Sequence, residues 1–489
     1  MVEIELKQES EADKKLEQTT KQEEQIEGIT KICATGTWDD EEDEQAAQDP
    51  APDTEIPAVD DIVQSMEQIL ALGQGLDDQD YKSELDILQN DPESNLFSAV
   101  TFEDLNLPEM LLKGVYGMKF TKPSKIQSVA LPLILSDPPE NLIGQAQSGS
   151  GKTATFALGM LYRVDPKVHS PQALCIGPTR ELVRQINAVV KAMGQFCDVE
   201  TFLAVPGVEV ERASRIKAPI VIGTPGRVEN LIKRKFLDTQ NIRILVLDEA
   251  DVMVAEDGQR ERSVAIKKMI KNRNCQILLF SATYADDVRD FAMKMVPKHN
   301  IITVKKEKLT LDGIKQFWID CASRETKYKI VSDLFAITTI GKCVIFVQSR
   351  ENAKELKQRM RDEGHSVGIL HGADMAKEVR DQMIDEFRLG TTNVLITTNV
   401  LARGIDIAGV SLVVNFDIPL TRDRKPDPET YLHRIGRTGR FGRKGCAINL
   451  VHDEQSKRAL ASIEAHYNRP IAQAPADDIE ELEKLLSWN

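Results

Sequence analysis

The stretch that decides the fold runs Ala146-Gln147-Ser148-Gly149-Ser150-Gly151-Lys152-Thr153. The short apolar run 141–143 precedes it, and residues 154–161 follow it with the composition of an apolar helix. Glycines let successive backbone N–H groups converge on phosphate oxygens, and the following helix presents its positive N-terminal end to the same anion. All eight residues are therefore predicted to bind a nucleoside triphosphate. Lys152 would reach the β- and γ-phosphates, and the Thr153 hydroxyl would ligate Mg²⁺. A solvated glycine loop is the alternative, which the flanking segments disfavour.

A second stretch supplies the carboxylates that such a site needs. It reads Ile244-Leu245-Val246-Leu247-Asp248-Glu249-Ala250-Asp251, and Asp248 lies 96 residues after Lys152. The continuous apolar run is typical of a parallel strand that is covered on both faces, and ligands bind at the carboxyl ends of such strands. Asp248 is predicted to hold Mg²⁺ through water, and Glu249 to orient and deprotonate the attacking water. An acidic loop cap is the alternative interpretation.

Apolar runs alternate with helical segments from about Phe102 onward. The first series contains 173–176, 220–222, 244–247 and 277–280. After a bend near 305–313 the second series contains 343–347, 367–370, 394–396, 412–416 and 447–451. Two successive series of this kind predict an α/β protein with two tandem parallel-sheet domains, at residues 101–305 and 314–489. Only the first series carries a phosphate loop, so the second domain would complete the site from outside.

The charge is divided unevenly along the 489 residues. Residues 1–100 hold 28 acidic and 6 basic side chains, a balance of −22, whereas the remainder holds 49 acidic and 56 basic ones, a balance of +7. A basic body favours a polyanionic partner, and the acidic segment is predicted to be a mostly disordered tail. Residues 60–72 of the tail have the apolar spacing of one amphipathic, regulatory helix. A tail that only solvates the chain is the alternative.

Cysteine usage and hydropathy restrict the compartment. The seven cysteines form no C-x-x-C pair, and several lie in apolar runs, as expected of reduced buried thiols in a cytosolic or nuclear protein. No apolar stretch reaches the roughly 18 residues that a spanning helix needs. The acidic, polar N-terminus does not read as a signal peptide. We expect neither a membrane segment nor a zinc or disulfide framework.

Eight motifs in a fixed order resemble those of the DEAD-box RNA helicases, over about residues 100–470. They are Phe120 with Gln127, the Lys152 loop, and the segments 178–182, 224–227, 248–251, 281–283, 402–406 and 433–440. Three further segments, 137–142, 423–428 and 467–470, resemble the mRNA-export branch of that family. The resemblance implies two RecA-like domains, an RNA-stimulated ATPase, ATP and Mg²⁺ as cofactors, and RNA as partner.

The resemblance also assigns roles in the nucleotide site. Gln127 would read the adenine edge through its amide, which can both donate and accept, and Phe120 would stack on the base. Asp406 would contact the ribose or phosphate region from the second domain. Phe120 as an ordinary core aromatic is the alternative.

Catalysis and domain closure are assigned by the same resemblance. Ser281 and Thr283 would link the γ-phosphate site to closure, although they could be ordinary turn residues. Arg437 and Arg440 resemble arginine fingers, whose planar forks suit the charge that develops on the transferred phosphoryl group. The run 433–440 could instead bind RNA phosphates.

RNA contacts are expected from short loops in both domains. The first domain would use Thr179, Arg180, Thr224, Gly226 and Arg227, and the second Ser349, Arg350, Arg380 and Thr398. Backbone N–H groups, hydroxyls and arginines read phosphate and 2′-OH, so binding should ignore base sequence. The chain departs from the family pattern at three places: Lys119 and Pro206-Gly207, where glycines are usual, and Lys377, where glutamine is usual.

The sequence thus predicts an ATP-dependent RNA helicase that remodels ribonucleoprotein in mRNA export. The alternatives are an ATP-locked RNA clamp and a general or translation-related helicase of the same family. The resemblance to the export branch implies a nucleoporin and an export activator dependent on inositol hexakisphosphate as partners. It also implies a monomer found in cytoplasm and nucleus, at the cytoplasmic face of the nuclear pore.

Overall fold

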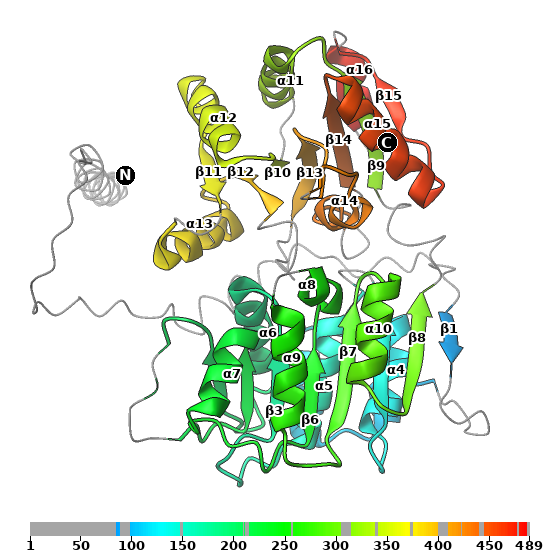
Figure 1. Ribbon diagram of the computed structural model, residues 1–489, viewed down its shortest axis with the longest axis vertical. Helices are drawn as coiled ribbons and strands as arrows, with labels where there is room; N and C mark the ends of the chain where they lie inside the picture. The colour runs from blue at the N-terminus through cyan, green and yellow to red at the C-terminus, as the bar shows by residue number, and fades with distance from the viewer. Residues whose placement is uncertain are drawn as a thin grey trace, which may run out of the picture. The chain divides into compact units, whose positions relative to one another are not determined.

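The computed structural model contains two β-sheets, each flanked by helices (Figure 1). It describes residues 85–88, 98–146, 150–208, 210, 215–255, 258–304, 314–337, 341–371, 375–399, 409–421, 423–439, 445–476 and 479–486. The predicted helix at 60–72 and the predicted bend at 305–313 lie outside these ranges. The two-sheet α/β architecture predicted from the sequence is confirmed.

The first sheet has eight strands in the order β1-β8-β2-β7-β6-β3-β5-β4. They are β1 (Leu85–Leu88), β2 (Asn141–Gln145), β3 (Ala173–Ile176), β4 (Thr201–Ala204), β5 (Ile220–Gly223), β6 (Ile244–Leu247), β7 (Gln276–Ser281) and β8 (His299–Val304). All pairings are parallel except that of β1 with β8. The four predicted strands, β3, β5, β6 and β7, occupy the centre and one flank of this sheet.

Strand β1 lies within residues 1–100, the predicted mostly disordered tail, and was not predicted from the sequence. The four residues of β1 pair antiparallel with β8, with Leu85 opposite Val304 and Ile87 opposite Ile302. Ile87 packs against the core on one face of the sheet. The surrounding composition is acidic and polar, so nothing local marks a strand, and its partner lies far downstream in the chain.

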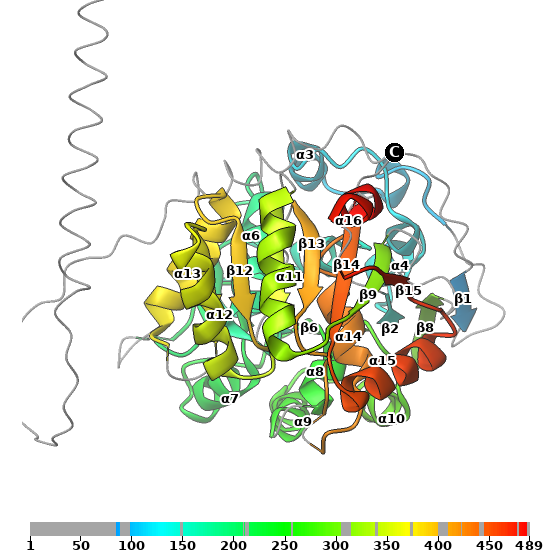
Figure 2. The same ribbon diagram turned by 90° about the horizontal axis from the view of Figure 1, so that it is seen from above.

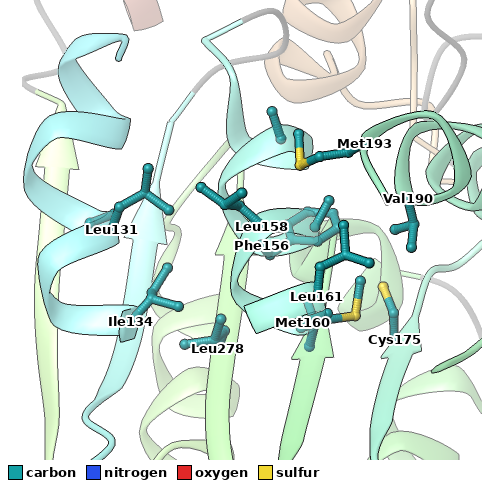
Figure 3. Packing of buried hydrophobic residues seen from close by; sticks show 14 of the residues in the cluster. Leu131, Ile134, Phe156, Leu158, Met160, Leu161, Cys175, Val190, Met193 and Leu278 are labelled. Atoms are coloured by element: carbon teal, nitrogen blue, oxygen red, sulfur yellow. The ribbon is translucent and has the colours of Figure 1, made fainter. Parts of the chain in front are cut away.

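Both faces of the first sheet are covered, as its continuous apolar runs require. Cys175 of β3 faces a cluster formed with α3 (Glu109–Gly117), α4 (Lys125–Leu135), α5 (Lys152–Arg163) and α6 (Arg180–Met193). Figure 3 shows this cluster, with Phe156, Leu158 and Leu161 of α5 between α4 and α6. The neighbouring Leu174 faces a second cluster with α7 (Pro225–Lys233), α8 (Ala250–Ala255), α9 (Gln259–Met269) and α10 (Asp286–Met295).

The second sheet has seven strands in the order β11-β12-β10-β13-β14-β9-β15, all paired in parallel. They are β9 (Ile314–Asp320), β10 (Lys342–Phe346), β11 (Val367–Leu370), β12 (Val394–Thr397), β13 (Val410–Asn415), β14 (Gly445–Val451) and β15 (Ala472–Ala474). The five predicted strands of the second series are β10 to β14. The two strands that were not predicted, β9 and β15, lie at one edge of the sheet.

Helices cover the second sheet on both faces as well (Figure 2). One face packs against α11 (Arg324–Ile337), α12 (Arg350–Asp362) and α16 (Ile479–Leu486). The other packs against α13 (Lys377–Leu389), α14 (Pro428–Ile435) and α15 (Glu454–Tyr467). Alternation along β10 shows the division, because Cys343 faces the first group of helices and Val344 the second.

The backbones of α3 and α6 approach each other closely at Gly114 of α3. A Cβ added to Gly114 would overlap the carbonyl oxygen of Met193, the last residue of α6. Glycine is therefore required for packing here, although it weakens a helix interior by roughly 0.5–1 kcal/mol relative to alanine. Gly117, one turn later, is exposed, and a Cβ there would meet the flexible end of Gln195 at 3.0 Å and the Phe196 ring at an ordinary contact distance of 3.7 Å.

The Gly114→Ala variant should therefore lower the free energy of unfolding by about 1–3 kcal/mol, since α3 and α6 must separate to admit a methyl group. Gly117→Ala is the matched control on the same helix and should change stability little. The midpoint of urea unfolding of the full chain measures both effects. A Gly114→Ala protein as stable as Gly117→Ala would show that α3 does not pack on α6 in this way.

Candidate nucleotide and RNA site

The ends of the phosphate loop are fixed at the carboxyl end of β2. Ala146 is fully buried, and its N–H donates to the carbonyl of Ser281 at 3.0 Å. Lys152 begins α5, is buried, and donates from Nζ to the Ala146 carbonyl at 2.5 Å. Gln147, Ser148 and Gly149 lie outside the described residues. The Lys152 side chain thus points back toward the end of β2.

The start of α4 clamps the other side of the loop. Ser124 Oγ donates to the Ser150 carbonyl at 2.9 Å, and Gln127 Nε2 donates to the Gly151 carbonyl at 3.3 Å. Gly151 has φ 97°, and a Cβ on it would lie 2.8 Å from Gln127 Nε2. This position therefore requires glycine both for its conformation and for its close contact.

Gln127 accordingly has a structural task that the sequence did not reveal. Its side chain is buried, and Oε1 accepts the N–H of Ser124 at 2.8 Å. Within the described part of the chain, these two hydrogen bonds leave one N–H and one lone pair of the Gln127 amide unused. Adenine recognition by Gln127 stays a prediction. Ser124 was not identified from the sequence, although a serine three residues before a glutamine is a helix-start signal.

The expected adenine-stacking residue follows an unusual backbone turn. Lys119 has φ 60°, in the left-handed region that favours glycine, and it stands where the family pattern has glycine. Phe120 is half-buried and packs against the cluster between the first sheet and α3 to α6. That contact is the core role considered as the alternative, and stacking on adenine stays a prediction.

Two carboxylates lie at the carboxyl end of β6, as predicted. Asp248 and Glu249 are buried, and Asp248 Oδ1 accepts the N–H of Glu249 at 3.0 Å. Burial raises the pKa of Asp248 to about 7, and the nearby charge of Lys152 opposes that rise. Glu249 has φ 54°, and its Oε2 has no hydrogen-bond partner within the described part of the chain. A buried carboxylate oxygen of this kind is suited to bind a ligand water.

The last acid of the motif, Asp251, collects groups from several elements. Its Oδ2 accepts the Thr283 hydroxyl at 3.1 Å and lies 3.0 Å from His433 Nε2 on α14. Its N–H donates to Ser281 Oγ at 3.3 Å. Ser281 and Thr283, the predicted coupling residues, therefore bond to the acidic motif itself. Asp251 and His433 belong to motifs named above but were not predicted as site residues.

Arg437 lies directly after α14, close to this contact. It is buried, and its Nε donates to the carbonyl of His433 at 3.0 Å. The second predicted finger, Arg440, and the predicted ribose contact, Asp406, lie outside the described residues. The structure therefore brings Arg437 and His433 together at the end of one helix.

The predicted RNA residues of the first domain cluster where helices begin after strands. Thr179 caps α6 by accepting the N–H of Leu182 at 3.3 Å, and Thr224 precedes α7. A Cβ on Gly226 would lie 2.9 Å from Arg262 Nη1, while Arg227 Nη2 donates to the Val208 carbonyl at 2.5 Å. Helix N-termini are ready sites for phosphate.

The second domain repeats this arrangement. Ser349 follows β10 and caps α12 by accepting the N–H of Asn352 at 3.1 Å, and Arg350 is the first residue of that helix. Thr398 follows β12. Both loops leave the carboxyl edge of the second sheet, where parallel strands place ligand-binding groups.

Two of the predicted RNA arginines pair with acids instead. Arg180 of α6 and its neighbour Arg184 both contact Asp381 of α13, at 2.8 and 2.5 Å. Arg380 contacts the buried Glu181 at 2.8 Å. Each of these pairs joins a helix of the first sheet to α13 of the second. RNA contact by Arg180 and Arg380 stays a prediction.

The departures from the family pattern have different consequences. At Pro206-Gly207, the Pro206 carbonyl accepts from Arg180 Nη1 at 2.8 Å, and Gly207 has φ 97°. The Pro206 segment is therefore bonded through its backbone to Arg180, one of the predicted RNA residues. Lys377 begins α13, where the family pattern has glutamine.

The residues present fit a nucleotide-bound magnesium ion. Mg²⁺ is usually held by one or two carboxylates together with substrate phosphates and water. Asp248 at the end of β6 offers the carboxylate, and Thr153 on the first turn of α5 offers a hydroxyl oxygen. No cluster of three or more His, Cys, Asp or Glu side chains capable of holding a metal occurs in the described ranges. Among the helices that the structure describes, none is long and apolar enough to cross a membrane.

Two family models match the chain. They are DEAD/DEAH box helicase at residues 124–291 and Helicase conserved C-terminal domain at residues 326–442. The ATP-dependent RNA helicase dbp5 of Schizosaccharomyces pombe is 51% identical over 399 residues, which are 82% of this chain and 79% of that protein.

Two solved structures share the fold. S. cerevisiae Dbp5 bound to RNA and ADP BeF3 matches with a TM-score of 0.76 and 47% identity, over 79% of this chain and 99% of that one. A variant of S. cerevisiae Dbp5 bound to Nup159, Gle1, IP6 and ADP matches with a TM-score of 0.59 and 44% identity, over 78% and 99%.

The raised pKa of Asp248 predicts a pH-dependent cost of folding. Between its ordinary value of 3.8 and about 7, the folded chain retains a proton that the unfolded chain releases. The free energy of unfolding should therefore fall as pH rises through this window. Asp248→Asn should stabilise the nucleotide-free protein in EDTA, by on the order of 2–4 kcal/mol above pH 7, and by progressively less toward pH 4.

Thermal unfolding of both proteins between pH 4 and 8 measures this difference. Asp290→Asn, at an exposed position of α10, is the control and should show no comparable gain. A gain at Asp248 that is the same at every pH would contradict the electrostatic explanation.

Proposed function

The chain belongs to the DEAD-box family of ATP-dependent RNA helicases, and we propose that it remodels ribonucleoprotein during mRNA export through the nuclear pore. The observation that carries the ATP-driven part of this proposal is the Asp251 carboxylate, which contacts Thr283 after the first sheet and His433 from the second. A nucleotide bound beside Asp248 and Glu249 would therefore be sensed by both sheets. We assign the ATP-binding domain to residues 101–305 and the C-terminal helicase domain to residues 314–489.

Hydrolysis would use groups that the structure gathers at the carboxyl end of the first sheet. Lys152 would bind the β- and γ-phosphates, and the Glu249 carboxylate would take the proton of the attacking water. Thr153 and Asp248 would hold Mg²⁺, which neutralises phosphate charge when bound. Phe120 and Gln127 would select adenine.

The second domain would complete the reaction. Arg437 and Arg440 would stabilise the charge on the transferred phosphoryl group, an effect worth roughly 10³–10⁵ in rate for arginine fingers. Asp406 would contact the nucleotide across the cleft. Because Ser281 and Thr283 bond to Asp251, and Asp251 lies against His433, these contacts support a coupling of domain closure to the γ-phosphate.

RNA would bind along loops and helix starts that carry hydroxyls, backbone N–H groups and arginines, without reading bases. Thr179, Thr224, Gly226 and Arg227 would serve in the first domain, and Ser349, Arg350 and Thr398 in the second. The ion pairs of Arg180 and Arg380 leave these two to share their donors between acids and phosphate.

The export role rests on the relatives. S. cerevisiae Dbp5 is bound to RNA in one structure and to Nup159, Gle1 and IP6 in another. By analogy we propose a nucleoporin and an activator dependent on inositol hexakisphosphate as partners of this chain. The chain would then act at the cytoplasmic face of the nuclear pore.

The Glu249→Gln variant tests the catalytic assignment. It should still bind ATP and single-stranded RNA, because glutamine has the size of glutamate and the phosphate loop is unchanged. Its rate of ATP hydrolysis should fall by at least about 10²-fold, because an amide cannot take the proton of the attacking water. Lys152→Ala should instead weaken ATP binding itself. Phosphate release and fluorescent-nucleotide binding separate the two variants.

Strand displacement from a short RNA duplex distinguishes the proposed function from an RNA clamp. The intact chain should release strands in ATP, and Glu249→Gln should not turn over. Turnover by Glu249→Gln at the normal rate would remove Glu249 from the mechanism. An intact chain that hydrolyses ATP and holds RNA without displacing a strand would favour the clamp.

A further inference from the structure

Arg434 is a fully buried cation that the reaction described above does not use. It lies on α14 next to His433, and only 1% of its side chain is exposed. Its guanidinium lies 4.9 Å from the centre of the Phe346 ring. Burial lowers the pKa of this guanidinium to about 10, so it remains charged at neutral pH. A buried charge must be satisfied by hydrogen bonds, and the acceptors of Arg434 are therefore informative.

The first acceptor is Asn399, which follows the predicted RNA residue Thr398. Arg434 Nε and Nη2 both donate to Asn399 Oδ1, at 3.2 and 2.5 Å. Asn399 is otherwise exposed, and its amide nitrogen donates no hydrogen bond within the described ranges. The Arg434 guanidinium thus fixes the start of the loop that follows β12. The side-chain N–H groups of Asn399 remain available to a ligand.

The second acceptor leads to the other RNA loop of this domain. Arg434 Nη1 donates to the Asp417 carbonyl at 2.7 Å. The Asp417 carboxylate accepts the N–H of Gln348 at 2.8 Å and the side-chain amide of Asn352 at 3.2 Å. These two residues flank the predicted RNA residues Ser349 and Arg350. One guanidinium therefore reaches both loops, directly at Asn399 and through Asp417.

The remaining bonds of this network run into the core. Arg434 Nη1 also donates to Asn415 Oδ1 at 3.1 Å, and Asn415 donates to Asn449 at 2.9 Å. Tyr431, one turn before Arg434, donates to Gln316 at 2.8 Å and accepts from Asn449 at 3.2 Å. This branch fixes α14 on the sheet, and within the described residues it makes no hydrogen bond to either RNA loop.

A contribution to folding stability does not explain why an arginine is buried at position 434. Its three acceptors are two amide oxygens and a backbone carbonyl, with no carboxylate oxygen among its hydrogen bonds. A buried charge of this kind contributes little compared with a well-packed apolar side chain. Its distinctive property is geometric, because a planar fork with five donors can bond several fixed acceptors at once, which lysine does not match.

We propose that Arg434 is a positioning residue that transmits RNA binding at the 348–350 and 398–399 loops to the ATP site. α14 carries Arg434 and His433 in succession and ends just before Arg437. A loop held by RNA would therefore fix Arg434, and through the helix it would hold His433 against Asp251. This inference rests on the proposed function, since it assumes that the two loops bind RNA.

The test is ATP hydrolysis by the full chain, titrated with polyuridine RNA at saturating ATP. Arg434→Lys keeps the charge but loses the fork, so its rate at saturating RNA should fall about tenfold, while the rate without RNA stays within about twofold. Asn399→Ala, which removes the shared acceptor at an exposed position, should lower RNA stimulation in the same manner, and its melting temperature checks that the variant folds. The double variant should fall no further than Arg434→Lys alone, because both changes break one link.

Tyr431→Phe is the matched control. It removes the hydrogen bonds of Tyr431 with Gln316 and Asn449 from the same helix and network without touching either RNA loop. Its melting temperature should fall, while its ratio of RNA-stimulated to basal rate should equal that of the intact chain. This ratio is a readout that a merely structural role of Arg434 would leave unchanged.

The outcomes separate this inference from the proposed function. Stimulation of the intact chain, with unchanged stimulation in both Arg434→Lys and Asn399→Ala, would overturn the inference alone. Multiplying effects in the double variant would also overturn it, since the residues would then act independently. An intact chain that RNA does not stimulate would overturn the proposed function together with the inference.

Discussion

A buried carboxylate must find partners, and the partners of Asp251 come from both sheets. Only 2% of its side chain is exposed, and its Oδ2 lies against Thr283 and His433. An unpaired charge at this depth would be expensive, so the contact constrains where α14 can lie relative to the end of β7. Parallel strands allow groups from both sheets to meet, because the loops that follow the strands of each sheet all leave from its carboxyl edge. Ser281, which accepts the Asp251 N–H, and Arg437, which donates to the His433 carbonyl, lie next to that contact.

The site and the core treat polar groups differently. At the nucleotide site, burial raises the pKa of Asp248, and Glu249 combines a left-handed backbone with a carboxylate oxygen that has no donor among the residues that the structure describes. Such features reduce stability and are found where a ligand is to be bound. The Arg434 network is the opposite case, because its buried donors meet fixed acceptors. Satisfied networks hold one geometry, which suits a part that transmits position.

The sequence predicted what depends on local pattern. Apolar runs located β3, β6 and β10, and the glycine loop located Lys152 at the start of α5. These succeed because a strand covered on both faces and a phosphate loop each leave a short, distinctive signature.

Contacts made with distant residues could not be predicted in this way. Strand β1 is stabilised by β8, and β15 by β9, at sheet edges where the local composition is weak. Arg180 and Arg380 were predicted to contact RNA phosphates. Each pairs with an acid on a helix that packs on the opposite sheet, Asp381 for Arg180 and Glu181 for Arg380. Gln127 was assigned to adenine, and its bond to the Gly151 carbonyl depends on how α4 meets the loop.

The central claim is that the two sheets share one catalytic site through Asp251 and His433. A double-mutant cycle with Asp251→Asn and His433→Ala, read as the ATP hydrolysis rate of the full chain at saturating RNA, tests it most directly. The account predicts that each single change lowers the rate by about tenfold or more and that the double variant is no slower than the worse single one. Independent, multiplying effects of the two changes would contradict it.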